Sequence, residues 1–221
     1  MARLMMHVQV FLLLVLMSPV VVADPDLGEE DLVSASFSGN LARVQGLLTA
    51  HTDVNTRDRY GNTALMAAAF DDHLDVVQAL LAAHAEVEAR DNYGNTALIL
   101  ASLDAHLGVM RALIDAHADV NAKADNGLTS LIAASTRQSH PDAVRALINA
   151  HADVNAATHG GYTALMAAAE AGHLDVVRAL IDAHADVNAK RFDGVTASVL
   201  ASERGHAEVV QIIGRFASTP K

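Results

Sequence analysis

The chain contains no cysteine and no tryptophan, and only 4% of its 221 residues are aromatic. Without cysteine there can be no disulfide framework, no thiolate nucleophile and no cysteine-linked lipid anchor. The scarcity of aromatic residues also argues against a deep aromatic ligand pocket of the kind that many enzymes use. The stability of this protein must therefore come from packed aliphatic side chains.

Basic residues are outnumbered: 15 Lys and Arg stand against 26 Asp and Glu, and the formal net charge is −11. The sequence contains no run of basic residues. Nucleic-acid binding needs clustered Lys and Arg that release counterions from phosphates. We therefore expect no nucleic-acid partner, and the charge balance favours a protein partner that carries some basic surface.

The familiar catalytic patterns are missing as well. There is no GxSxG nucleophile elbow, no glycine-rich phosphate loop and no HExxH pair. Adjacent carboxylates such as Asp71 and Asp72 fall in a predicted connection, without an apolar pocket that could perturb one of them. We predict that the protein is not an enzyme and that it uses no cofactor.

What the chain does have is repetition. Five pivot glycines, at positions 61, 94, 127, 161 and 194, are spaced 33, 33, 34 and 33 residues apart. A repeat of this length is one supersecondary unit that cannot bury its apolar face alone, so neighbouring units must stack. The sequence therefore predicts a solenoid.

Each unit divides into a turn, a short helix, a connection, a second helix and a loop. In the unit 58–90, Gly61 can adopt the positive φ of a tight turn, and Thr63 can cap a short helix over 64–69. A second helix is predicted from Leu74. Its apolar stripe, predicted to be core, consists of Val76, Val77, Leu80 and Leu81.

The phrases GNTALMAAA, GNTALILAS, GLTSLIAAS and GYTALMAAA, each followed later by AHADVNA or a near copy, resemble ankyrin repeats over about residues 24–216. The resemblance implies an all-α ankyrin solenoid of about six repeats, in which stacked helix pairs carry projecting β-turns. It also implies a scaffold that binds other proteins without catalysis. The expected units are 24–57 (a cap), 58–90, 91–123, 124–157, 158–190 and 191–221 (a cap), within a domain spanning 24–221.

Two departures from the family pattern are visible. The family motif Thr-Pro-Leu-His is replaced by phrases such as Thr63-Ala64-Leu65-Met66, so other contacts must hold the loops. Histidine stands where the family usually has glycine after the second helix, and we expect it to take the left-handed helix-ending conformation. These helix-ending histidines are His51, His84, His117, His151 and His184.

A second set of histidines, His73, His106, His140, His173 and His206, lies at the predicted starts of the second helices. Such columns admit a metal-binding interpretation. Equivalent atoms of packed helices lie about 8 to 10 Å apart, however, whereas zinc ligands must each approach to about 2 Å. We therefore expect no metal site. Protonated helix-ending histidines would favour helix C-termini, which predicts a higher melting temperature near pH 6 than near pH 8.

The unit 124–157 carries one extra residue in the connection 135–140. Pro141 follows this connection and suits the first position of a helix. The insertion is therefore expected to lengthen a loop on the inner side of the stack without breaking the second helix.

The first 23 residues differ from the rest. Arg3 is their only charge, and Val21-Val22-Ala23 resembles a cleavage site before Asp24. We interpret residues 1–23 as an export signal that is cleaved, which places a monomeric protein in the periplasm or outside the cell, free of the membrane. The alternative is an uncleaved anchor, because Leu4 to Ala23 is about long enough to span a bilayer.

The positions that vary between units define the candidate binding surface, here called the variable strip, which combines the turn tips with the ends of the first helices. Aromatic anchors dominate interface energetics, and the scarce aromatics gather in or beside this strip, Tyr162 included. We predict that the strip binds a protein partner. Alternatives are an anchored receptor or secreted effector that binds a host protein, and a histidine-rich metal-binding structural protein. The strip comprises Arg59, Tyr60, Phe70, Asp71, Asn92, Tyr93, Leu103, Asp104, Asp125, Asn126, Arg137, His159, Glu170, Phe192 and Arg204.

Overall fold

The computed structural model describes residues 31–137 and 140–217, and these residues form twelve helices and no extended strand. The proposed export signal lies outside the described residues. None of the described helices is long and apolar enough to span a membrane.

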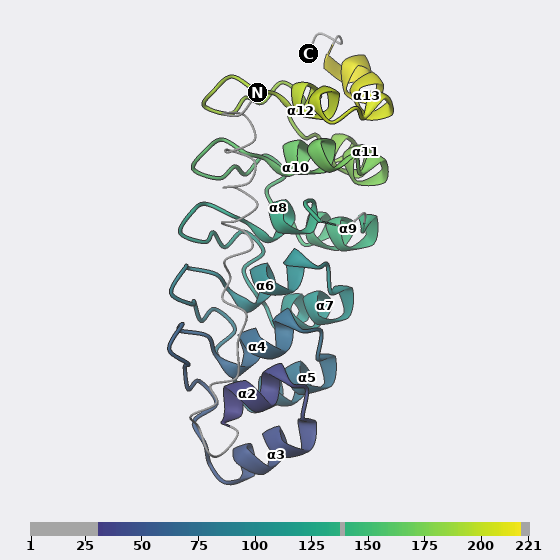
Figure 1. The fold of residues 1–221 in the computed structure, drawn as a ribbon. Coiled ribbons are helices and arrows are strands. Elements are labelled where there is room, and N and C mark those ends of the chain that lie inside the picture. The colour runs from purple at the N-terminus through teal and green to yellow at the C-terminus, as the bar shows by residue number, and fades with distance from the viewer. Residues whose placement is uncertain (1–30, 138–139, 218–221) are drawn as a thin grey trace.

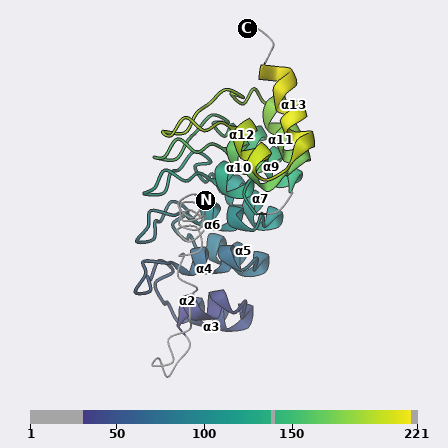
Figure 2. The same cartoon turned by 45° about the horizontal axis from the view of Figure 1, so that its top comes forward.

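The helices alternate along the chain between two rows. The inner row, nearer the projecting turns, consists of α2 (Leu32–Phe37), α4 (Ala64–Phe70), α6 (Ala97–Leu103), α8 (Ser130–Ala134), α10 (Ala164–Ala171) and α12 (Ala197–Glu203). The outer row consists of α3 (Leu41–Thr49), α5 (Leu74–Ala82), α7 (Leu107–Asp115), α9 (Pro141–Asn149), α11 (Leu174–Asp182) and α13 (Ala207–Ala217). Each helix packs on its sequence partner and on the next helix of its own row, and the turns all project on one side (Figures 1 and 2). The predicted solenoid is confirmed.

Local sequence explains where these helices begin and end. The Thr63 hydroxyl accepts a hydrogen bond from the Met66 amide at 3.3 Å, and threonine caps every following inner helix in the same way. Pro141 opens α9, as predicted. The five helix-ending histidines have φ between 62 and 66°, which confirms the predicted left-handed conformation.

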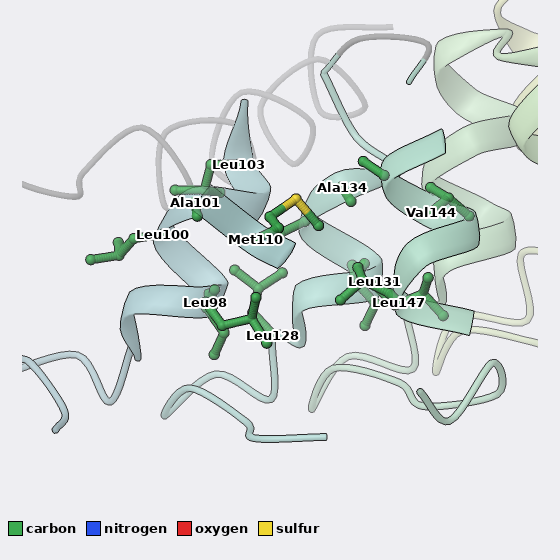
Figure 3. Close-up of a cluster of buried hydrophobic side chains, with 14 of the residues drawn as sticks. Leu98, Leu100, Ala101, Leu103, Met110, Leu128, Leu131, Ala134, Val144 and Leu147 are labelled. Carbon is green, nitrogen blue, oxygen red and sulfur yellow. The ribbon is translucent and has the colours of Figure 1, made fainter. Parts of the chain in front are cut away.

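The core runs the length of the stack as one aliphatic layer between the two rows. Figure 3 shows a section of it, where side chains of α6 and α7 meet those of α8 and α9. Small residues such as Ala68 and Ala101 are fully buried and let neighbouring inner helices approach closely. The outer-row leucines Leu80, Leu113 and Leu147 are likewise fully buried.

The turns are held by contacts that the family's histidine does not supply. The Asp58 carboxylate accepts hydrogen bonds from the amides of Tyr60 and Asn62, each at 2.8 Å. Main-chain bonds then join successive turn tips, as from the Asn92 amide to the Tyr60 carbonyl at 2.9 Å. The prediction that other contacts replace the missing histidine is confirmed.

Two arginine side chains add a further link between turns. The Arg57 guanidinium donates to the Gly61 carbonyl of its own turn and to the Arg90 carbonyl of the next one. Arg90 repeats this arrangement, donating to the carbonyls of Gly94 and Lys123 at 3.2 and 2.6 Å. We call these contacts arginine clips.

Candidate functional site

The turn tips present the exposed half of the variable strip. Tips in neighbouring units are bonded to one another, because the amides of Asn92, Asp125 and His159 donate to the carbonyls 32 or 33 residues earlier. The unit repeat therefore fixes the spacing of the tip side chains. The tip residues Arg59, Asn92, Asp125, Asn126, His159 and Phe192 are all exposed.

Two aromatic side chains stand out on these tips. Tyr93 is 47% exposed and Phe192 is 86% exposed, which is unusual for large apolar groups. Tyr60 is half-buried, and the Arg59 guanidinium lies 4.9 Å from its ring centroid in a cation–π contact. The tips thus offer aromatic anchors with polar neighbours, a composition that suits protein recognition.

The other half of the strip lies at the ends of the inner helices, where ion pairs connect neighbouring units. Arg137 donates to both carboxylate oxygens of Asp104 at 2.9 and 3.0 Å. Arg204 donates to Glu170 at 2.7 Å. Four strip residues therefore already form ion pairs with one another within the protein.

Tyr162, which was expected in or beside the strip, is buried. Its side chain is only 5% exposed, and its hydroxyl donates to Glu170 at 2.7 Å. Burial raises the pKa of the Tyr162 phenol, and the neighbouring Glu170 carboxylate adds to this effect. Tyr162 thus belongs to the internal network with Glu170 and Arg204 and offers no exposed anchor.

Leu103 also differs from the expectation. It is 6% exposed and forms part of the core cluster, so it offers almost no side-chain surface to a partner. Phe70, at the equivalent position one unit earlier, is half-buried and packs against the same core.

Asp71 lacks an arginine partner of the kind that Asp104, its equivalent in the next unit, has in Arg137. Its side chain is 51% exposed, and its carboxylate lies 3.2 Å from His73. The adjacent Asp72, which the strip prediction omitted, is 57% exposed and lies 3.7 Å from His106. Asp72 also adopts φ +59°, where Gly39 and two later units use glycine. The unit 58–90 thus presents two carboxylates that no described arginine or lysine neutralises.

The histidines at the starts of the outer helices have a structural role that the sequence did not reveal. Nε2 of His73, His106 and His206 lies 2.9 to 3.1 Å from a main-chain carbonyl at the end of the inner helix of the preceding unit. Each bond spans 36 residues, and only the three-dimensional stack brings the two groups together. Among the described residues, no three His, Cys, Asp or Glu side chains gather as metal ligands would.

Comparisons with known proteins agree with this architecture. The family model "Ankyrin repeats (3 copies)" matches residues 32–124, 109–191 and 130–216. The crystal structure of an ankyrin repeat domain from Acinetobacter baumannii AYE is 30% identical, with a TM-score of 0.74, and the match covers 83% of this chain and 96% of that chain. No curated protein matches the chain.

Proposed function

Because the chain belongs to the ankyrin repeat family, whose members generally serve as non-enzymatic scaffolds for protein–protein interaction, we propose that it binds a protein partner through the variable strip. The exposure of Tyr93 and Phe192 on the turn tips carries this proposal. An exposed aromatic ring costs solvation free energy in the free protein, and burial against a partner recovers it.

The distribution of charge favours the N-terminal part of the strip, in the unit 58–90, as the main contact region. The unit 58–90 contains six acids and two bases, a net charge of −4, whereas residues 191–217 contain three of each and are neutral. The acids Asp104 and Glu170 already pair with arginines, but Asp71 and Asp72 do not. We propose that the partner brings basic side chains to these two carboxylates.

Crosslinking in the native extract tests the aromatic anchors. We expect the variant with Tyr60, Tyr93 and Phe192 changed to Ala to remain folded and to lose the partners that the parent chain captures. The matched control changes Val199 and Phe216 to Ala, since these side chains are 42% and 49% exposed but lie outside the strip. Equal capture by parent and strip variant would show that the strip is not the binding surface.

A second experiment tests the charge of the partner. Once a captured protein has been purified, D71N/D72N should weaken its binding and reduce the dependence of affinity on salt. D182N/D186N makes the same change in net charge at exposed residues outside the strip, and should have a smaller effect. Equal weakening by the two variants would indicate only a long-range effect of net charge.

For location, we propose export to the periplasm or beyond the cell, with residues 1–23 as the signal. The support is the uncharged segment from Leu4 to Ala23 and the small residues before Asp24. Sequencing of the mature N-terminus tests this proposal. A start near Asp24 supports cleavage, whereas a start at Met1 in a membrane fraction favours an anchored receptor.

A further inference from the structure

The packing between neighbouring inner helices is weakest between α8 and α10. α8 contains five residues, whereas the other inner helices contain six to eight. α8 packs extensively on α6 but much less on α10, although α10 is the longest helix of the row. The short length of α8 therefore does not by itself explain the weak contact.

The histidine bond that joins neighbouring units on the inner side elsewhere is also not formed here. His73, His106 and His206 bond to the unit before them, but the buried Nε2 of His173 has no hydrogen-bond partner among the described residues. The carbonyls of Thr136 and Arg137 face this ring without completing a bond to that atom. Thr136 is the counterpart of the acceptors Phe70 and Glu170, but the insertion places it 37 residues before His173, whereas the bonded pairs are 36 residues apart.

No ion pair compensates for this loss. Arg137 at the end of α8 turns back to Asp104 in the preceding unit, and Glu170 at the end of α10 turns forward to Arg204. Within residues 31–137 and 140–217, no ion pair joins the unit 124–157 to the unit 158–190. The arginine clips also stop before this boundary, because Lys123 and Ala157 follow Arg90 in their column.

The outer row and the loops, in contrast, continue across the same boundary. α9 and α11 pack at least as closely as the other outer pairs. The Asn155 side chain accepts a hydrogen bond from the Asp186 amide at 2.7 Å, and the His159 amide donates to the Asn126 carbonyl at 3.0 Å. The two units are therefore held on the outer side and at the turns, but weakly on the inner side.

From this asymmetry we propose that the boundary between α8 and α10 is a hinge of the solenoid, about which residues 31–157 and 158–217 move as two blocks. The pivot is the α9–α11 contact, and the movement tilts one block against the other. The tilt changes the separation of the two inner helices most, and it also changes distances across the boundary between outer-helix surfaces two units apart. Interfaces with few inner contacts and an intact pivot are where shear or hinge motion concentrates. This inference is independent of the proposed partner.

The absence of cysteine makes the hinge directly measurable, because two introduced cysteines can carry spin labels without competition. The exposed outer-helix positions Gln78, Arg111, Arg145, Arg178 and Gln211 are equivalent in successive units. Three pairs, each two units apart, can be compared by pulsed electron spin resonance. Arg111/Arg178 and Arg145/Gln211 span the hinge, and Gln78/Arg145 is the matched control on one side of it.

We expect broader distance distributions for both pairs that span the hinge than for Gln78/Arg145, in labelled proteins that melt at the parent temperature. Hydrogen exchange offers a second readout without labels, in which amides of α8 and α10 should exchange faster than those of α4 and α6. Equal distribution widths for the three pairs, or equal protection of these helices, would overturn the hinge.

Discussion

Ser130 is a polar residue at a position that other units give to alanine. Its hydroxyl is buried, and no described residue forms a hydrogen bond with it, whereas Ala64, Ala97, Ala164 and Ala197 fill the equivalent sites. A buried hydroxyl without a partner loses its bonds to water and gains none in return. The serine therefore lowers the stability of its unit.

We expect Ser130→Ala to raise the free energy of unfolding by about 1 kcal/mol. Urea denaturation of the parent and the variant measures this difference. Ser102→Ala is the control, because the Ser102 hydroxyl is equally buried but donates to the Leu98 carbonyl at 2.7 Å. A gain of the same size in the control would mean that hydrogen bonding is not the cause.

His173 links the stability of the fold to pH. Burial lowers the pKa of its imidazole, the nearby His206 and His140 act in the same direction, and the carbonyls of Thr136 and Arg137 partly offset the shift. A histidine with a lowered pKa stabilises the fold above its ordinary value of about 6.5, and that contribution is lost as the pH falls below it.

We therefore expect His173→Gln to lose less stability than the parent between pH 7 and pH 5, as measured by thermal melting across this range. All other histidines are present in both proteins, so the comparison isolates His173. If the melting temperatures of the two proteins change by the same amount with pH across this range, His173 is not the cause of the pH dependence.

Structural roles that depend only on neighbouring residues in the chain could be predicted from residue type. The threonine caps and the left-handed histidines depend on a few neighbouring backbone groups, so the sequence predicted them correctly. The sequence did not predict that Leu103, a residue of the expected strip, and Tyr162, expected in or beside it, are buried, because their burial depends on side chains from other elements. One signal was available for Tyr162, since Glu170 follows eight residues later, near the end of α10, which begins two residues after Tyr162.

At the scale of elements, the arginine clips offer a way to strengthen the stack. Lys123 occupies the position of Arg57 and Arg90, and the carbonyls of Gly127 and Ala157 are the equivalents of those that the clips use. A planar guanidinium can donate to two carbonyls at once, which a single ammonium does less well.

We expect Lys123→Arg to raise the free energy of unfolding by about 1 kcal/mol, because it would connect the turns that precede α8 and α10. Lys190→Arg is a close control, since it makes the same substitution in the last turn, where no following turn supplies the second carbonyl. Chemical denaturation measures the free energy of unfolding of both variants. An equal gain for Lys190→Arg would show that a bond between two turns is not the cause.

The boundaries of the elements followed from sequence because the repeat shows each of them several times. The second helix predicted from Leu74 begins there, and Pro141 opens α9 as expected. The consequence of the insertion was not predictable in the same way. His173 lacks the bond to the preceding unit that His106 and His206 form, and its expected acceptor Thr136 lies 37 rather than 36 residues earlier because of the insertion.

At the scale of the whole molecule, stacking explains both what the sequence revealed and what it did not. The 33-residue period fixes the rows of helices and the column of turn tips, so the candidate strip could be located in advance. Which of its charges pair internally depends on contacts between units, as with Arg137 and Asp104. A single sequence shows that both residues are present but not that they meet.

Stacking also predicts that the cost of a core mutation depends on its position along the chain. Leu113 in a central unit and Ile213 in the last unit are both almost fully buried at equivalent helix positions. Truncating either to Ala should cost about 2 to 5 kcal/mol locally. A central unit is coupled to two neighbours, however, whereas the last unit is coupled to one.

We therefore expect Leu113→Ala to lower the hydrogen-exchange protection of most of the stack, and Ile213→Ala to lower it only in α12 and α13. The reason is that the last unit can unfold while the other units keep their own contacts, but a central unit cannot. Residue-resolved exchange on the two variants measures the difference. Loss of protection in α4 and α6 on changing Ile213 would show that the protein unfolds as one cooperative body, and that coupling between neighbours does not govern its stability.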